Sequence, residues 1–127
     1  MNLFDTGVIL EMLKRHQFKP GFITPIIVLE ILRGFEKEKR LPMKQRLKKS
    51  FAVIDMDDEI TEAYCEIYRK LKQDGTLLPD ADILIAATAI AHNLPLETID
   101  DPFQRLRGFG LEISGYENKS VEESSVA

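Results

Sequence analysis

The chain has 127 residues, the usual size of one domain that buries its own apolar core without disulfide or metal staples. It has a single cysteine and no apolar run close to the roughly 20 residues that cross a bilayer, which excludes a disulfide-framework protein and a membrane-spanning one, so we expect a cytoplasmic protein. The net charge of −4 is unevenly spread, because residues 33–49 carry +6 and the remainder −10.

Short apolar segments alternate with segments of helical periodicity along the chain. This order predicts an α/β domain with a central, mainly parallel sheet of four or five strands flanked by helices. The predicted strands are 3–4, 22–23, 51–54, 94–99 and 111–113. The predicted helices follow Asp5, begin at Pro25, and cover about 35–49, 57–73, 81–92 and 101–108. We expect one domain at residues 1–115 and a flexible polar tail at 116–127.

Capping residues refine three of these elements. Thr24 and Pro25 fit an N-cap and the first position of a helix that is apolar nearly all round and therefore predicted to lie deep in the domain. Asp101 is the expected N-cap of the short helix that Gly108 ends, which leaves Asp100 without a capping role. Cys65, within a helical pattern, is expected to be a buried small apolar residue.

The basic segment 33–49 has two readings. Eight of its residues are basic and two are acidic, which is typical of a surface that binds phosphate groups. A solvated helix face with charges of both signs explains the same composition equally well.

Four acidic residues stand at the edges of apolar segments. They are Asp5, Glu30, Asp82 and Asp100. An unpaired carboxylate in apolar surroundings is destabilising, and a hard divalent cation would neutralise several at once. Carboxylate oxygens are the ligands that Mg²⁺ and Mn²⁺ prefer. Phosphodiester hydrolysis is therefore the first hypothesis.

Each acid also has an ordinary explanation. Asp5 fits a helix cap, Asp82 fits a first-turn acid beside the helix dipole, and Asp100 fits a turn residue. Glu30 has no capping role, and its alternative is a buried ion pair with a basic residue such as Arg33 or Arg105.

Taken in order, four local patterns resemble the PIN-domain ribonucleases, in particular the small toxins of VapC type. The patterns are Leu3-Phe4-Asp5-Thr6, Val28-Leu29-Glu30-Ile31-Leu32-Arg33-Gly34, Asp82-Ile83-Leu84-Ile85-Ala86-Ala87-Thr88-Ala89, and Thr98-Ile99-Asp100 followed by Phe103. The resemblance implies a PIN-like fold and an endoribonuclease that depends on Mg²⁺ or Mn²⁺.

The same resemblance assigns residues to the site. It implies that Asp5, Glu30, Asp82 and Asp100 are the metal ligands and catalytic acids. Thr6, Asp80 and Thr98 would lie around those ligands and hold them. Arg33, Lys37 and Arg40, from the basic segment, are the candidate contacts with the RNA substrate.

Partners follow from the resemblance as well. Members of the family commonly form homodimers and are silenced by a cognate antitoxin protein. The candidate partner surface is the apolar face of Val8, Ile9, Met12 and Leu13 together with Ile31, Leu32 and Phe35.

Two departures from the family pattern keep a second hypothesis open. Gly7 stands where the family usually has Asn or Ser, and the stretch between Asp5 and Glu30 is short. The alternative is a non-catalytic PIN-like module that binds RNA or a protein, which Gly7 favours, whereas the four retained acids favour the nuclease.

Overall fold

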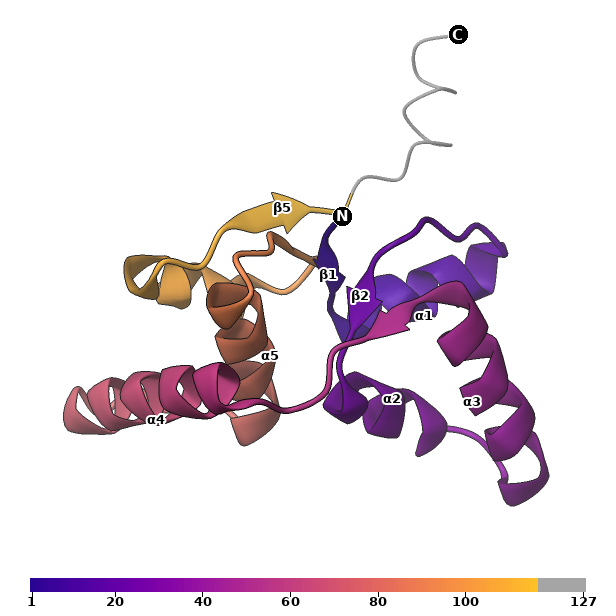
Figure 1. Cartoon of the computed structure of the whole chain (residues 1–127), viewed down its shortest axis with the longest axis horizontal. Coiled ribbons are helices and arrows are strands. Elements are labelled where there is room, and N and C mark those ends of the chain that lie inside the picture. The colour runs from indigo at the N-terminus through magenta and orange to yellow at the C-terminus, as the bar shows by residue number, and fades with distance from the viewer. Residues whose placement is uncertain (117–127) are drawn as a thin grey trace, which may run out of the picture.

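A five-stranded parallel sheet lies at the centre of the molecule (Figure 1). In this computed structural model residues 1–116 are described, and the strand order is β3-β2-β1-β4-β5. The strands are β1 (Leu3–Phe4), β2 (Phe22–Ile23), β3 (Ala52–Val53), β4 (Leu96–Thr98) and β5 (Ile113–Gly115). The predicted α/β class and parallel sheet are confirmed, and every observed strand overlaps a predicted one.

Helices connect the strands and cover the sheet. They are α1 (Thr6–Arg15), α2 (Pro25–Leu32), α3 (Lys37–Ser50), α4 (Asp58–Gln73), α5 (Asp80–Ala91) and the 3₁₀ helix η1 (Asp101–Phe109). The helix α4 packs along α5 on one side of the molecule, and α3 packs against α2 on the other (Figure 1). Within residues 1–116, no helix is long and apolar enough to cross a membrane.

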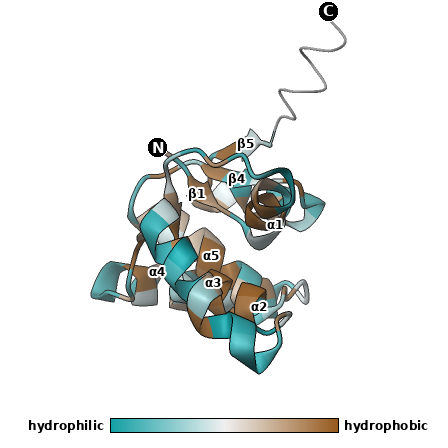
Figure 2. Ribbon diagram, turned by 90° about the vertical axis from the view of Figure 1, so that its right-hand side faces the viewer, coloured by the Kyte–Doolittle hydropathy of each residue, from teal (hydrophilic) through white to brown (hydrophobic). Residues whose placement is uncertain are grey.

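The core is formed by the strands and by the inner faces of the helices. The helix α5 is mostly hydrophobic along its length, whereas α4 shows a hydrophilic outer face (Figure 2). Ile83 and Ile85 of α5 and Leu3 of β1 are fully buried. Parallel strands need such cover on both faces, because neither face of a parallel sheet is left to water.

The start of α2 agrees with the prediction, but its depth agrees only in part. Thr24 is the N-cap, its hydroxyl accepts a hydrogen bond from Ile27 N at 3.3 Å, and Pro25 is the first helical residue. The expectation that α2 lies deep in the domain holds for one face only, since Ile27, Val28 and Ile31 are buried whereas Leu29 is 62% exposed. A helix at the edge of a domain keeps one apolar side toward solvent even when its sequence is apolar throughout.

The short helix after β4 begins and ends differently from the prediction. Asp100 occupies its N-cap position, without a capping side-chain bond, and Asp101 is the first helical residue. The helix continues past Gly108 to Phe109, and Gly110 caps it with a φ of 96°, the left-handed conformation that glycine adopts readily. The assigned roles of Asp101 and Gly108 are therefore wrong.

Cys65 is exposed, against the expectation that it is buried. The buried face of α4 is formed by Ile60, Ile67 and Leu71. Cys65 lies about 140° around the helix from Ile60, so it projects away from the core.

The predicted partner surface on α1 faces the interior instead. Val8, Ile9 and Met12 are at most 1% exposed, and Ile31 of α2 is 2% exposed. These side chains pack the core and are not accessible to a partner, so this prediction is wrong for them. An amphipathic stripe has the same sequence pattern whether it covers its own sheet or a second protein.

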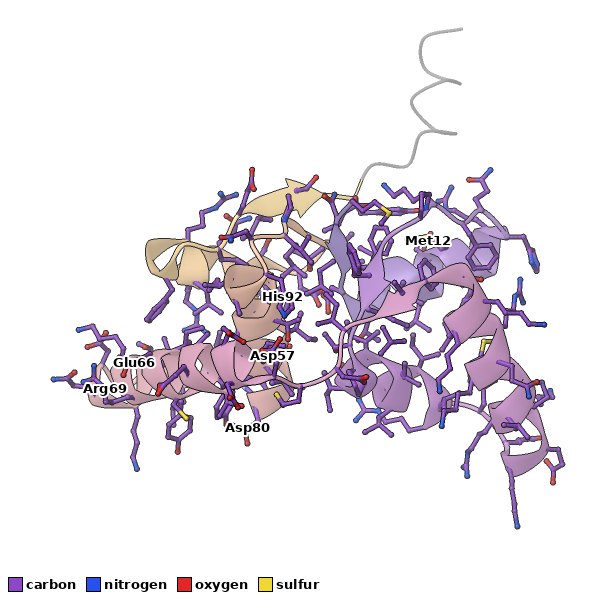
Figure 3. The ribbon with its side chains drawn as sticks, in the orientation of Figure 1. Met12, Asp57, Glu66, Arg69, Asp80 and His92 are labelled. Carbon is purple, nitrogen blue, oxygen red and sulfur yellow. The ribbon has the colours of Figure 1, made fainter. Side chains whose placement is uncertain are left out.

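Two contacts between polar side chains tie distant segments together. His92 Nε2 lies 2.7 Å from Asp57 Oδ2, which joins the end of α5 to the start of α4 (Figure 3). Lys19 Nζ lies 2.6 Å from Glu97 Oε2 on the central strand β4. The Lys19 ammonium also lies 5.4 Å from the ring centre of Tyr116, the last described residue. The rest of the predicted tail, 117–127, lies outside the described residues.

Candidate active site

The four acids come from four different elements around one edge of the sheet. Asp5 follows β1 and is the N-cap of α1, and Asp100 follows β4. Because β1 and β4 are neighbouring parallel strands, their carboxyl ends meet at the same edge. Glu30 belongs to α2, and Asp82 lies in the first turn of α5.

Asp5 is the buried member of this set, with 3% of its surface exposed. Its Oδ1 accepts a hydrogen bond from Thr6 N at 2.7 Å, and its Oδ2 accepts one from Thr98 Oγ1 at 2.9 Å. Asp5 is thus both the helix cap suggested by the ordinary reading and a carboxylate fixed in the site. Both carboxylate oxygens of Asp5 therefore accept a hydrogen bond.

Hydroxyl groups continue this network to two further acids. Thr98 Oγ1 accepts a hydrogen bond from Asp100 N at 3.0 Å, so it links Asp100 to Asp5. Thr6 Oγ1 donates to Glu30 Oε1 at 2.8 Å. Hydrogen bonds, together with the N–Cα–Cβ–Oγ1 atoms of Thr6, therefore form a continuous path from the backbone N of Asp100 through Asp5 to Glu30.

Glu30 has both a site contact and the ion pair that the alternative reading proposed. Its Oε2 lies 3.8 Å from Arg33 Nη2, near the limit for an ion pair. The Arg33 side chain is 76% exposed and that of Glu30 is 20% exposed. A pair so open to water compensates little charge, so Glu30 remains an acid with available negative charge.

Burial and mutual repulsion shift the protonation of two acids. Desolvation raises the pKa of Asp5 to about 6, partly opposed by the hydrogen bonds from Thr98 and Thr6 and reinforced by the charge of Asp100. Desolvation, with the charges of Glu30 and Asp100, also raises the pKa of Asp82. All four acids are therefore linked by electrostatic interactions, and a positive charge close to them is favoured.

The acids are neighbours without forming a ready-made ligand set. Among residues 1–116, no group of three or more His, Cys, Asp or Glu side chains is spaced to hold a metal ion. The donor chemistry nevertheless fits a hard cation, because all four groups are carboxylates.

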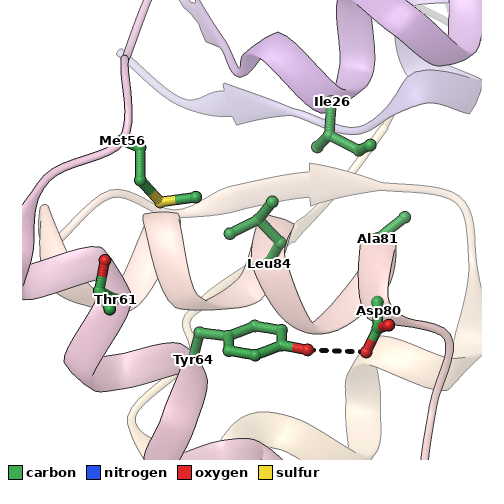
Figure 4. Close-up of a pocket in the computed structure, with 7 residues that line it drawn as sticks. All are labelled: Ile26, Met56, Thr61, Tyr64, Asp80, Ala81 and Leu84. Atoms are coloured by element: carbon green, nitrogen blue, oxygen red, sulfur yellow. Dashed lines mark hydrogen bonds between the residues drawn. The ribbon is translucent and has the colours of Figure 1, made fainter.

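Asp80 lies in a pocket that α4 and α5 form with the start of α2 (Figure 4). Its Oδ1 accepts a hydrogen bond of 2.7 Å from Tyr64 OH, and this contact raises the pKa of Tyr64 to about 12. The pocket measures about 250 Å³, and Met56 and Leu84 also line it. The observed bond of Asp80 is thus directed toward α4, and it fixes the start of the helix that carries Asp82.

The three basic residues predicted to contact RNA lie at the junction of α2 and α3. Arg33 is near Glu30, Lys37 is the exposed first residue of α3, and Arg40 donates from Nε to Phe35 O at 2.9 Å. Arg33 alone of the three has a contact with one of the four acids in this structure. Lys37 and Arg40 extend a basic surface away from them along α3.

Sequence reasoning missed one residue beside the acids. Ile99, which the strand prediction 94–99 included, lies just beyond the end of β4, between Thr98 and Asp100. It is 57% exposed, although it is one of the large apolar residues of the chain. The signal in the sequence was that Ile99, an apolar residue, stands directly between two candidate site residues, Thr98 and Asp100.

Comparisons with known proteins agree with this geometry. The family model described as the PIN domain matches residues 3–108. The protein named ribonuclease VapC1 from Methanocaldococcus jannaschii is 36% identical over 115 residues, which cover 87% of this chain and 85% of that protein. Ribonuclease VapC2 from Rickettsia felis is 32% identical over 95 residues, 71% of each chain.

Solved structures show the same fold. VapBC2 from Rickettsia felis, bound to a DNA fragment from its promoter, matches with a TM-score of 0.74 at 22% identity, covering 91% of this chain and 98% of that chain. VapBC-1 from nontypeable Haemophilus influenzae matches with a TM-score of 0.74 at 20% identity, covering 90% and 96%. Fold, family model and relatives agree, and the chain belongs to the PIN-domain family.

Proposed function

We propose that this PIN-domain protein is a metal-dependent endoribonuclease and the toxin of a toxin–antitoxin pair. The observation that carries the proposal is the hydrogen-bonded path from Asp100 through Thr98, Asp5 and Thr6 to Glu30. Helix capping accounts for Asp5 alone, and it gives no reason for Glu30, Asp82 and Asp100 to gather near a buried carboxylate. Relatives named ribonuclease VapC support the reaction class.

The residues that would hold Mg²⁺ or Mn²⁺ are Asp5, Glu30, Asp82 and Asp100. Desolvation by burial, followed by repulsion from neighbouring carboxylates, raises the pKa of Asp5 and of Asp82, and a bound cation would relieve both effects. When bound, such an ion lowers the pKa of a water ligand and stabilises charge on a phosphate.

The remaining residues position these acids and the substrate. Thr98 fixes Asp5 and the backbone of Asp100, and Thr6 fixes Glu30. The bond between Tyr64 and Asp80 holds the first turn of α5, from which Asp82 projects. Arg33, Lys37 and Arg40 would bind RNA phosphates, which basic side chains attract over distances near 10 Å.

The test is cleavage of a mixed set of structured and single-stranded RNAs with Mg²⁺, with Mn²⁺ and with EDTA. Wild-type protein is expected to cut only with a divalent ion, and Asp5→Asn and Asp82→Asn are expected to lose that activity by at least about a hundredfold. Asp101→Asn is the matched control, because Asp101 is an exposed acid next to the site in sequence. A folded wild-type protein that cuts no RNA with either ion would contradict the proposal.

A non-catalytic RNA-binding module is the second candidate. The observation in its favour is that the acids of the described chain do not form a pre-assembled metal group. RNA binding that is unchanged by metal, without cleavage, would favour this candidate. For such a module, Asp5→Asn is expected to keep RNA binding, because removing a negative charge does not weaken attraction to phosphate.

An antitoxin partner is part of the proposal, and the surface we assign to it is a groove between α2 and α3. The solved neighbours are toxin–antitoxin complexes. The groove has a volume of about 560 Å³ and is lined by exposed Leu29 and by Lys44 and Lys48, among others. This chemistry fits a segment with apolar side chains flanked by acids. Co-purification with the product of an adjacent gene tests it, and Leu29→Asp is expected to abolish the complex.

Assembly and location complete the proposal. A homodimer is expected from the family pattern, and light scattering of the purified protein tests it as a mass of twice 14.5 kDa. A cytoplasmic location is supported by the proposed RNA substrate.

A further inference from the structure

The backbone of α1 approaches the side chain of Ile99 at Gly7. A Cβ atom added to Gly7 would lie 3.3 Å from both Cγ1 and Cδ1 of Ile99. Contacts this short require the neighbour to move by a few tenths of an ångström. Glycine is a poor helix former and Gly7 is the second residue of α1, so helix propensity does not account for it, whereas the contact with Ile99 limits the size of a side chain at this position.

The contact joins the two chain segments that carry the hydrogen-bonded path from Asp100 through Thr98, Asp5 and Thr6 to Glu30. Gly7 directly follows Thr6, which bonds Glu30. Ile99 lies between Thr98, which bonds Asp5, and Asp100. An apolar side chain that is 57% exposed therefore lies against the backbone that follows Asp5 and directly precedes Asp100.

We propose that Ile99 is a specificity-determining residue that packs against the base or ribose of the RNA nucleotide beside the cleaved phosphate, and that Gly7 leaves the room it needs. The inference rests on the proposed ribonuclease function. Since an aliphatic side chain has no hydrogen-bonding group, it selects a nucleotide by shape and apolar contact. Uniform binding of this kind acts on KM more than on kcat.

Ile99→Ala tests the contact directly. On a defined pool of short RNAs with Mg²⁺, we expect kcat/KM at the preferred sites to fall about fivefold, kcat to stay near that of the wild type, and the distribution of cleavage sites to change. Leu77→Ala is the control, because Leu77 is also an exposed apolar residue, at 46%, in the connection between α4 and α5. The control is expected to keep the wild-type cleavage pattern.

Gly7→Ser tests the space that the proposal assigns. The added side chain displaces Ile99, so the cleavage pattern is expected to shift in the same direction as in Ile99→Ala. In the double variant Gly7→Ser/Ile99→Ala the clash is absent, and the loss in kcat/KM is expected to be smaller than the product of the two single losses. Multiplicative losses and an unaltered cleavage pattern in Ile99→Ala would overturn the inference.

Failure of the proposed function is distinguishable from failure of this inference. If the wild type cuts no RNA, fluorescence anisotropy with labelled oligonucleotides decides the matter. Selective weakening by Ile99→Ala and not by Leu77→Ala would then retain Ile99 as an RNA contact while the nuclease proposal fails. Equal binding by all three proteins, or no binding, would overturn the inference. Thermal unfolding of each variant verifies that it is folded.

Discussion

Thr98 Oγ1 donates a hydrogen bond of 2.9 Å to Asp5 Oδ2 and accepts one from Asp100 N at 3.0 Å. One hydroxyl thus links the acids at the ends of two neighbouring strands. The backbone fixes both Asp5 and Thr98, because Asp5 N donates a hydrogen bond to Glu97 O at 3.0 Å and Thr98 is part of β4. The spacing of Asp5 and Asp100 is therefore a property of the sheet as well as of the two side chains.

Thr98→Val removes this link while keeping the shape of the side chain. The hydrogen bond from Thr98 lowers the pKa of Asp5, so its loss is expected to move that pKa above about 6. Folding stability is expected to fall by about 1–3 kcal/mol, because a buried acceptor loses its donor. Carbon-detected NMR titration of the Asp5 carboxyl in metal-free protein measures the first effect. Thr98→Ser keeps the hydroxyl and is expected to match the wild type; an unchanged Asp5 pKa in Thr98→Val would contradict the assigned role.

Asp5→Asn is expected to stabilise the metal-free fold while it abolishes metal-dependent cleavage. The pKa of Asp5 is raised from 3.8 to about 6, so the folded state binds this proton more tightly than the unfolded state does. The contribution of Asp5 to stability therefore falls as pH rises through this window, by at most about 3 kcal/mol, and the deficit is complete at pH 7.

Urea unfolding in EDTA between pH 4 and pH 7.5 measures this difference. The variant is expected to be more stable than the wild type at pH 7, and the two curves are expected to converge toward pH 4. Asp101→Asn, which changes an exposed acid, is expected to show no such pH-dependent gain. A wild type that is more stable than Asp5→Asn at pH 7 would show that the buried carboxylate is compensated.

The sequence predicts the sheet and the neighbourhood of the acids for a physical reason. Alternating strands and helices require parallel strands, and parallel strands bring Asp5 and Asp100 to one edge. The sequence also places Asp82 among these acids, because it predicts Asp82 in the first turn of a helix, where α5 has it. The bonds of Thr6 and Thr98 depend on side-chain rotamers, which only the packed structure fixes.

The errors and the omission concern features that the three-dimensional structure decides and that no local sequence pattern contains. The apolar stripe of Val8, Ile9 and Met12 has one pattern for two outcomes, and only the position of the sheet decides that it is buried. The ends of η1 depend on backbone φ at Gly110, which a second glycine at Gly108 obscured. The contact between Gly7 and Ile99 joins residues that are 92 positions apart, so no local pattern contains it.

Lys19→Met is expected to destabilise the protein more than Glu97→Gln does. Glu97 is 3% exposed, its Oε2 lies 2.6 Å from Lys19 Nζ, and its Oε1 accepts from Asn2 Nδ2 at 2.9 Å. Removing the lysine leaves a buried carboxylate without its cation, whereas glutamine leaves no charge to compensate. Because the Lys19 side chain is 41% exposed, we expect a loss of about 1–3 kcal/mol and not the larger value of a fully buried pair.

Urea unfolding at pH 7 of the two single variants and of Lys19→Met/Glu97→Gln measures this effect. The double variant is expected to recover part of the loss of Lys19→Met. Equal stability of Lys19→Met and the wild type would show that water reaches Glu97 and compensates its charge.

Asp57→Ala is expected to lower the melting temperature more than His92→Ala does, because Asp57 has two functions. Its Oδ1 accepts the capping hydrogen bond of α4 from Ile60 N at 2.8 Å, while its Oδ2 lies 2.7 Å from His92 Nε2.

The capping bond and then the His92 contact lower the pKa of Asp57, so the stability that these contacts contribute is present at neutral pH and is lost as pH falls through that lowered pKa. His92→Ala removes the contact with Asp57 Oδ2 and leaves the cap. Differential scanning fluorimetry at pH 7 and at pH 3 distinguishes the two, with Asp57→Asn as the variant that retains a capping side chain. Equal melting temperatures for Asp57→Ala and His92→Ala at pH 7 would show that the cap does not stabilise α4, and that the contact across the ends of α4 and α5 carries the whole effect.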